Sequence, residues 1–254
     1  MSQVFGTYSR YYDTLYREKD YEKECGYILS LIKTYGTVEP NSLLDLGCGT
    51  GGHAVLLAEH FDRITGIDRS SDMLEIAGEK TSGVSNRIDL MQSDISDFSL
   101  EETFDAAVSL FAVIGYLNTN EAVTNCFTAV RDHLNPKGLF MFDVWYGPAV
   151  LSQKPEDRYK IIENDTGKII RFAGPVLKTM QDTVTVNYRI LELDGDRVVN
   201  ELEESHSMRY FFVPEVRYML ETCGFELLDV FPYLEQDTEP GQDDWNVMFI
   251  ARKK

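Results

Sequence analysis

The chain has 254 residues, 43% of them hydrophobic, and a formal net charge of −18. This length and composition fit one α/β domain with an elaboration and provide enough apolar material for a core. A field this negative opposes binding to the phosphates of DNA or RNA, so we expect a small-molecule partner and no nucleic acid.

The sequence gives no sign of membrane spans, disulfides or metal ligands. No stretch approaches the ~18 consecutive apolar residues of a membrane span, and Met1-Ser2-Gln3-Val4 lacks the basic and apolar parts of a signal sequence. The four cysteines form no C-x-x-C pair, and the four histidines show no metal-ligand spacing. We therefore expect a cytoplasmic protein with free thiols, no membrane and no metal ion.

Residues 5–35 form a tyrosine-rich segment that is otherwise full of charge and that we expect to be helical. Tyr16 and Tyr21 are most simply interpreted as amphipathic core anchors. Tyr11 and Tyr12 are candidates for a functional role instead.

The most informative motif is an apolar run, Leu43 to Leu46, that leads into four glycines within residues 47–52. The run is typical of a buried parallel strand, and the apolar spacing of residues 53–59 suits a helix. Glycine allows positive φ and close approach of a ligand, and a helix N-terminus favours an anion or a carboxylate. This pattern predicts a nucleotide-cofactor turn.

The glycine spacing alone fits two cofactors. Gly47, Gly49 and Gly52 match the dinucleotide pattern G-x-G-x-x-G, whereas Gly47, Gly49 and Gly51 match D-x-G-x-G-x-G with Asp45 as the acid. In the second arrangement the segment 44–51 resembles the first motif of the class I S-adenosylmethionine-dependent methyltransferases.

Two further strands follow in the same order as in that family. The segment 64–68 ends in Asp68, at the spacing of an acid that accepts both ribose hydroxyls. The segment 88–95 ends in Asp94 and Ile95, which resemble the family's contacts to the adenine amino group and ring. The resemblance implies S-adenosylmethionine as cofactor. The full set of expected cofactor-binding residues is Tyr11, Asp45, Gly47, Cys48, Gly49, Gly51, Asp68, Arg69, Met73, Asp94, Ile95, Leu110 and Phe111.

Strands and helices alternate regularly from residue 43 to 144. We expect strands at 43–46, 63–67, 87–91, 104–110 and 138–144, with helices at 52–61, 71–80 and 120–134. Such alternation predicts a mostly parallel sheet covered by helices on both faces, with its site outside the carboxyl ends of the strands. The resemblance to the methyltransferases implies that the sheet is doubly wound, seven-stranded and Rossmann-like.

After Val144 the pattern changes: residues 183–190 alternate with period two, and Asp194-Gly195 is a hairpin signal. The segment 151–212 is expected to be an inserted antiparallel sheet that forms a lid on the acceptor side. Residues 1–150 would then form the cofactor-binding core with its N-terminal helical cap, and 213–254 a closing helix and two antiparallel strands.

Methyl transfer from a sulfonium needs an aligned nucleophile and exclusion of water, and a base only where the nucleophile must lose a proton. Tyr116, Asp143 and Tyr12 are the residues that we expect at the reaction centre, because Tyr116 and Asp143 follow or end strands and Tyr12 lies in the cap. His206, in a Glu-rich strand, is interpreted as a solvated pair partner.

The segments around Ile114-Gly115-Tyr116 and Asp143-Val144-Trp145 narrow the resemblance to the methyltransferases that dimethylate amino groups of nucleotide-linked deoxysugars. Two differences alter the acceptor pocket. Tyr116 stands where those enzymes commonly have a histidine, and Val144 interrupts their acid-Pro-Trp group. The sequence therefore leaves open whether the methylated group of a sugar-like acceptor is an amino or a hydroxyl group. It also leaves open whether the methyl group is added to nitrogen, oxygen or carbon.

Residues 151–212 hold 9 of the 24 basic residues, which suits an anionic acceptor; Arg171 and Arg209 are the expected phosphate contacts. A homodimer is a further expectation. Two alternatives stand beside the methyltransferase: a NAD-dependent oxidoreductase and a non-catalytic S-adenosylmethionine-binding protein.

Overall fold

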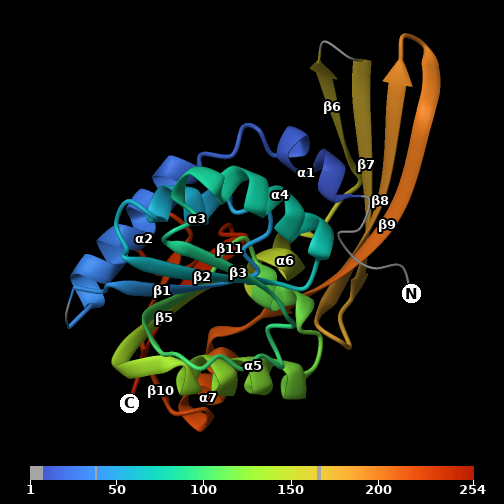
Figure 1. Cartoon of the computed structure of the whole chain (residues 1–254). Helices are drawn as coiled ribbons and strands as arrows, with labels where there is room; N and C mark the ends of the chain where they lie inside the picture. Colours follow the sequence, from blue (N-terminus) through green and yellow to red (C-terminus); the bar gives the residue numbers. More distant parts are fainter. Residues whose placement is uncertain (1–7, 38, 165–166) are drawn as a thin grey trace.

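A computed structural model describes residues 8–37, 39–164 and 167–254 (Figure 1). Its main sheet contains seven strands in the order β3-β2-β1-β4-β5-β11-β10. The first five are parallel, whereas β11 is antiparallel to both β5 and β10. The strands of this sheet are β1 (Ser42–Leu46), β2 (Arg63–Asp68), β3 (Ile88–Gln92), β4 (Phe104–Ser109), β5 (Leu134–Tyr146), β10 (Phe225–Pro232) and β11 (Asn246–Lys253). The predicted doubly wound sheet is confirmed.

Helices cover both faces of this sheet (Figure 1). On one face pack α2 (Tyr21–Tyr35), α3 (Gly52–Leu57) and α4 (Ser71–Thr81), and on the other α5 (Asn120–Asp132) and α7 (Val213–Thr222). Two large apolar clusters fill the space between the sheet and these two helix layers. None of the described helices is both long and apolar enough to cross a membrane.

The inserted sheet is a four-stranded antiparallel meander of β6 (Arg158–Asn164), β7 (Gly167–Lys178), β8 (Thr183–Asp194) and β9 (Arg197–Phe211). It is not separate from the core, because β9 pairs in parallel with the end of β5 at Trp145↔Tyr210 and Tyr146↔Phe211. This junction holds the inserted sheet beside the carboxyl ends of the core strands, and the sheet projects from there (Figure 1).

Within its described residues, 8–35, the N-terminal segment contains two helices instead of one, while residues 5–7 of the expected helical segment lie outside the described residues. Helix α1 (Ser9–Leu15) ends at a turn, and α2 begins after Asp20, whose side chain accepts a hydrogen bond from the Lys23 N–H at 2.9 Å. An N-cap of this kind favours a new helix start. The break lets α1 leave the core and pack on the inserted sheet, where Tyr8, Tyr11 and Leu15 join a cluster with β6, β7 and β8.

Three other expectations were wrong in detail. Helix α3 ends at Leu57, and a short helix, α6 (Gly147–Gln153), follows β5 directly. Residues 135–137, which separate the expected helix 120–134 from the expected strand 138–144, lie within β5, at a register irregularity between the pairs Phe104↔Leu134 and Ala106↔Leu139. A bulge carries the extra residues without ending the strand, and Lys137 takes a φ of 65° there.

Candidate active site

A cavity of about 430 Å³ lies at the carboxyl ends of β1, β2, β3 and β4, between the core, α1 and the inserted sheet. This is the position at which open α/β sheets bind ligands. Most of the residues expected to bind the cofactor or to act at the reaction centre line it. These are Tyr12, Gly47, Cys48, Gly49, Asp68, Arg69, Met73, Asp94, Ile95, Leu110, Phe111 and Tyr116.

The glycine turn presents open backbone to this cavity. The N–H groups of Gly47 and Cys48 both donate to the Ile67 carbonyl, at 2.7 and 3.0 Å, which fixes the turn to β2. Gly47 has φ of 73°, and a Cβ built there would lie 2.5 Å from Val113 Cγ1. Gly49 has φ of 55°, and its added Cβ would meet nothing within 4 Å. The turn thus leaves ligand space at Gly49 that an L side chain would enter.

Asp68 ties the turn to the start of α4. Its carboxylate accepts from the Gly49 N–H at 2.9 Å and from the Ser70 N–H at 2.8 Å. Burial raises the pKa of Asp68, and these two backbone hydrogen bonds oppose that shift. A carboxylate has about four acceptor sites, so Asp68 can hold the turn and still accept ligand hydroxyls.

Asp94 organises the loop after β3. One oxygen, Oδ1, accepts from the Ser96 N–H at 2.8 Å and from the Ser96 hydroxyl at 2.7 Å, the geometry of an Asx turn. Asp94, Ile95 and Ser96 all line the cavity. The Asp94 carboxylate therefore lies at the cavity, at the end of the third strand.

The rest of the cavity is aromatic. Tyr8, Tyr12 and Tyr16 recur every four residues along α1 and its ends, so that they share one helix face. Trp145 enters from the end of β5 and Tyr188 from β8. Tyr16 and Tyr21, which the sequence interpretation assigned to the core, also line the cavity. This part has room and aromatic surface for an acceptor molecule.

A buried chain of polar side chains ends at Tyr116. The Tyr116 hydroxyl lies 2.8 Å from His206 Nδ1, and His206 Nε2 lies 2.8 Å from Glu204 Oε1. His206 and Glu204 are only 3% and 5% exposed. The interpretation of His206 as a solvated partner was therefore wrong: the residue lines the cavity. Glu204, His206 and Met208 alternate along β9 on its buried face, a period-two signal that the Glu-rich composition obscured.

Asp143 lies behind the cavity wall and is not among the residues that line it. It is fully buried, and both carboxylate oxygens accept from the Ala112 N–H at 3.0 Å, while Asn246 Nδ2 donates to Oδ2 at 2.8 Å. Phe111 and Ala112 adopt left-handed φ of 73° and 55°, which costs energy for residues with a side chain. Asp143 thus stabilises this strained turn, and its expected place at the reaction centre is wrong.

Three expected cofactor ligands also lie outside the cavity lining, namely Tyr11, Asp45 and Gly51. The Tyr11 hydroxyl donates to Glu192 Oε2 at 2.8 Å and accepts from Asn200 Nδ2 at 2.7 Å, on the inserted sheet. Tyr11 points away because it lies one residue out of phase with Tyr8, Tyr12 and Tyr16. Asp45 is buried beneath the glycine turn, and its Oδ2 has no hydrogen-bond partner among the residues that the structure describes.

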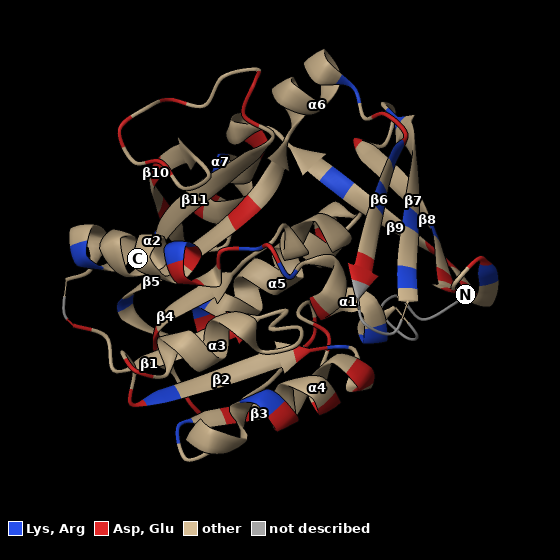
Figure 2. Ribbon diagram, turned by 90° about the horizontal axis from the view of Figure 1, so that it is seen from above, with Lys and Arg blue, Asp and Glu red and all other residues tan. Residues whose placement is uncertain are grey.

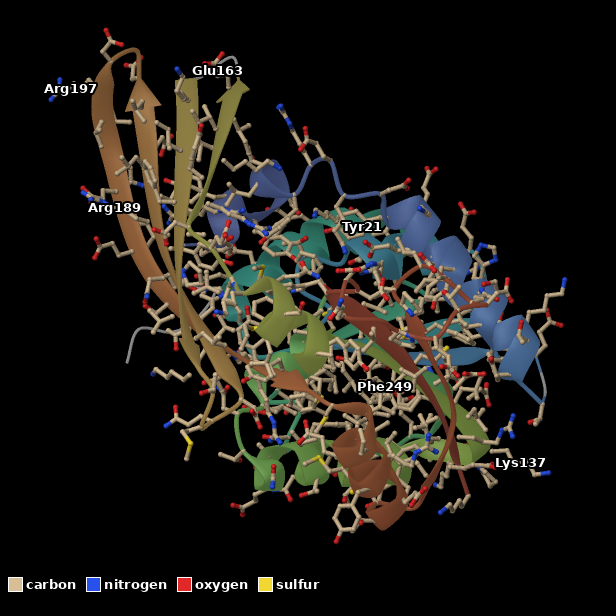
Figure 3. The ribbon with its side chains drawn as sticks, turned by 180° about the vertical axis from the view of Figure 1, so that it is seen from behind. Tyr21, Lys137, Glu163, Arg189, Arg197 and Phe249 are labelled. Carbon is tan, nitrogen blue, oxygen red and sulfur yellow. The ribbon has the colours of Figure 1, made fainter. Side chains whose placement is uncertain are left out.

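The two expected phosphate contacts are engaged elsewhere. Arg209 pairs with Glu215 at 3.1 Å and stacks on Phe211, and Arg171 Nη1 donates to the hydroxyls of Tyr8 and Tyr16. Neither arginine lines the cavity. Figure 2 shows charges of both signs on the inserted strands, and in Figure 3 Arg189 and Arg197 point from that sheet away from the core.

No group of three side chains that could hold a metal ion occurs within residues 8–37, 39–164 and 167–254. All four cysteines are free and buried.

Comparisons with known proteins assign the family. A methyltransferase-domain family model matches residues 43–138. The dTDP-3-amino-3,6-dideoxy-alpha-D-glucopyranose N,N-dimethyltransferase of Streptomyces fradiae is 30% identical over 81% of this chain and 78% of that protein. The chain belongs to the class I S-adenosylmethionine-dependent methyltransferases.

Other relatives cover nearly the whole chain. A putative methyltransferase of Bacillus subtilis, YqeM, is 29% identical over 98% of this chain and 97% of its own length. The crystal structure of DesVI from Streptomyces venezuelae is 25% identical and superposes with a TM-score of 0.81 over 97% of this chain and 98% of its own. A methyltransferase structure from Clostridium acetobutylicum gives 0.83 at 21% identity over 99% of each chain, which supports the fold.

The protein is thus an enzyme that uses S-adenosylmethionine, and the oxidoreductase and non-catalytic alternatives are set aside. The residues present fit the cofactor, because Gly49 leaves open space at positive φ and two strand-end carboxylates, Asp68 and Asp94, line the same cavity. When bound, S-adenosylmethionine supplies an electrophilic methyl group on a sulfonium. The roles of the individual lining residues are proposals from here on.

Proposed function

We propose that this enzyme methylates the amino group of a nucleotide-linked amino sugar. Three curated relatives of 28 to 30% identity, which cover 81 to 85% of this chain, are named as N,N-dimethyltransferases of dTDP-linked amino deoxysugars. Their alignments extend beyond the cofactor-binding segment, which the family model matches at residues 43–138. The likeness therefore includes parts of the chain that line the acceptor half of the cavity.

The observation that carries the proposal is the aromatic half of the cavity with Tyr116 and His206 at its inner end. Faces of Tyr and Trp rings pack against the C–H surface of a sugar or base, and they attract an ammonium group by about 0.5–2 kcal/mol. The residue directly after Gly115 is Tyr116 and not a histidine, but β9 of the inserted sheet supplies His206 to this pocket.

In this proposal Asp68 binds the ribose hydroxyls of the cofactor, Asp94 and Ile95 contact the adenine, and the turn at Gly47, Cys48 and Gly49 accommodates the methionine part. Arg69, Met73, Leu110 and Phe111 complete the cofactor half, while Tyr12 and Tyr116 contact the acceptor. The protein contributes to methyl transfer by holding the nucleophile near the methyl group and by excluding water. The cytoplasmic location and the homodimer also remain predictions.

Labelled S-adenosylmethionine with matched acceptors tests the proposal. dTDP-3-amino-3,4,6-trideoxy-α-D-glucopyranose should be methylated, whereas the same nucleotide sugar with a 3-hydroxyl group, the free amino sugar and a simple alkylamine should not. Product masses identify the number of methyl groups added. Methylation of the hydroxyl analogue in preference to the amine would overturn the proposed acceptor group while leaving the methyltransferase assignment intact.

A further inference from the structure

We propose that Tyr116, His206 and Glu204 form a proton relay that lets one bound acceptor amine be methylated twice. This inference rests on the proposed function, because it assumes an amine as acceptor. It assigns a proton-transfer role to two residues of the inserted sheet in addition to Tyr116.

The direction of the hydrogen bonds follows from the carboxylate of Glu204. An ionised carboxylate can only accept, so Glu204 Oε1 requires a proton on His206 Nε2 at 2.8 Å. The neutral imidazole then has an unprotonated Nδ1, which accepts from the Tyr116 hydroxyl at 2.8 Å. The donors of these hydrogen bonds therefore point from Tyr116 to His206 and from His206 to Glu204. A proton that reaches Tyr116 from the cavity can be passed on to His206.

Aromatic rings pack against the middle of the relay. Tyr8 and Tyr188 pack against the His206 ring, with ring centroids 5.4 and 5.0 Å away. Burial raises the pKa of Tyr116 well above its usual value, so the phenol stays protonated and passes a proton on. In this low-dielectric site the nearby Glu204 carboxylate stabilises an imidazolium that forms on His206.

Tyr116 also lies at the boundary between the two halves of the cavity. The Arg69 guanidinium, from the loop after β2, sits over its ring at 5.8 Å, while its hydroxyl reaches the inserted sheet. A nucleophile held beside Tyr116 can therefore approach the cofactor half and contact the relay at the same time.

The steps balance as follows. The neutral amine nitrogen attacks the methyl carbon, a C–N bond forms, the C–S bond breaks, and its electron pair goes to sulfur, giving S-adenosylhomocysteine. The nitrogen is now a cation that still carries protons. One of them moves to the Tyr116 oxygen while the Tyr116 proton moves to His206 Nδ1. His206 keeps this proton while a second S-adenosylmethionine replaces S-adenosylhomocysteine, and the imidazolium returns the proton through Tyr116 to water once the dimethylated product has left.

Removal of that proton is required before a second methyl group can be added, because the nitrogen needs its lone pair again. A relay variant should therefore add the first methyl group to a neutral amine and stall before the second. This ratio of products distinguishes proton transfer from a merely structural role, which would lower both additions together.

The test compares Tyr116→Phe, His206→Gln and Glu204→Gln with Glu203→Gln, whose side chain is exposed on the same strand. With dTDP-3-amino-3,4,6-trideoxy-α-D-glucopyranose, the first two variants should lose about 10²–10⁴-fold in the second methylation and accumulate monomethyl product. Glu204→Gln should lose less, and Glu203→Gln nothing, while affinity for S-adenosylmethionine stays unchanged in all four. An unaltered ratio of monomethyl to dimethyl product in the relay variants overturns the relay.

A second measurement separates this failure from failure of the proposed function. Nitrogen NMR of the imidazole-labelled protein with bound S-adenosylhomocysteine should show His206 with its proton on Nε2, and Tyr116→Phe should shift the Nδ1 resonance. A proton on Nδ1 instead overturns the relay. If the native enzyme methylates none of the amino-sugar probes, the acceptor proposal fails, and the NMR result alone decides whether the hydrogen-bonded chain runs as inferred.

Discussion

Asp68 combines two tasks, since it fastens the glycine turn and presents acceptor capacity to the cavity. Asp68→Ala should weaken S-adenosylmethionine binding by about 1.5–3 kcal/mol, the range for hydrogen bonds to a charged group. Titration calorimetry measures this directly. Asp89→Ala, an exposed carboxylate on β3, is the matched control and should bind as the native protein does. Native affinity in a folded Asp68→Ala variant would refute the ribose contact.

Asp45 offers a test that depends on pH. Burial first, and the Asp68 charge second, raise its pKa to about 7. The folded protein therefore binds this proton more tightly than the unfolded chain does, whose Asp has a pKa of about 3.9. Ionisation of Asp45 consequently costs stability as pH rises from about 4 to about 7, and the cost persists above that range.

Asp45→Asn cannot ionise. In the cofactor-free protein it should be more stable than the native chain above about pH 7, by up to about 4 kcal/mol, and equal to it near pH 4. Urea denaturation at both pH values checks this, with Asp89→Asn as control. A variant that is less stable than the native protein at the higher pH would show that the carboxylate is held ionised in the fold.

At the scale of elements, α1 joins three parts of the molecule. Asp13 accepts from the Thr50 hydroxyl at 2.8 Å and pairs with Lys80 at 2.7 Å, which ties α1 to the glycine turn and α4. On its other side Lys160 Nζ donates to the Leu15 carbonyl at 2.9 Å. The helix thus covers the cavity as a lid fastened to both the core and the inserted sheet.

Asp13→Ala should loosen that lid. Because the ion pair with Lys80 is partly exposed, we expect a modest loss of about 0.5–1.5 kcal/mol in cofactor affinity, with faster hydrogen exchange over residues 9–15. A double-mutant cycle with Lys80→Ala isolates the pair, and the exposed Arg10→Ala is the control. Additive effects of the two substitutions would show that the pair does not hold α1.

The elements most faithfully predicted are those in which one local pattern decides the structure. The apolar run at 43–46, followed by glycines, strongly favours a buried strand, and every residue of β1 is buried in the structure. Asp143 could not be placed in the same way. Its buried strand position suggested a functional carboxylate, but its partners are the Ala112 N–H and Asn246, one of them 103 residues away. Only the tertiary fold brings these together.

The same holds for the relay. Tyr116 and His206 are 90 residues apart, and they meet because β9 pairs with the end of β5. Period two along β9 could have indicated that His206 shares a buried face with Glu204 and Met208, yet nothing local indicates which element covers that face. In the segment 151–212 the sequence pattern was misleading. The segment is enriched in basic residues, but Arg171 and Arg209 make internal contacts and do not line the cavity.

For the whole molecule, the net charge of −18 is the dominant long-range property. Arg171 and Arg209 are engaged in internal contacts, so the expectation that these two arginines bind the phosphates of an anionic acceptor loses its basis. A dTDP-linked sugar is anionic, so the field of the protein should repel it on approach. Added salt screens such repulsion once the Debye length falls below about 10 Å, near 0.1 M.

We therefore expect kcat/KM for the nucleotide sugar to rise a few-fold, on the order of 2–5, as ionic strength increases from about 0.01 to 0.15 M. S-adenosylmethionine carries a net positive charge, so kcat/KM for this cofactor should fall as the ionic strength increases. Arg69 is an exposed cation in the cavity lining, so it attracts the anionic nucleotide sugar and partly offsets the repulsion by the acidic protein. Arg69→Ala should steepen the rise for the nucleotide sugar. A decrease of kcat/KM with salt, abolished by Arg69→Ala, would mean that this single cation outweighs the acidic field at the mouth of the cavity.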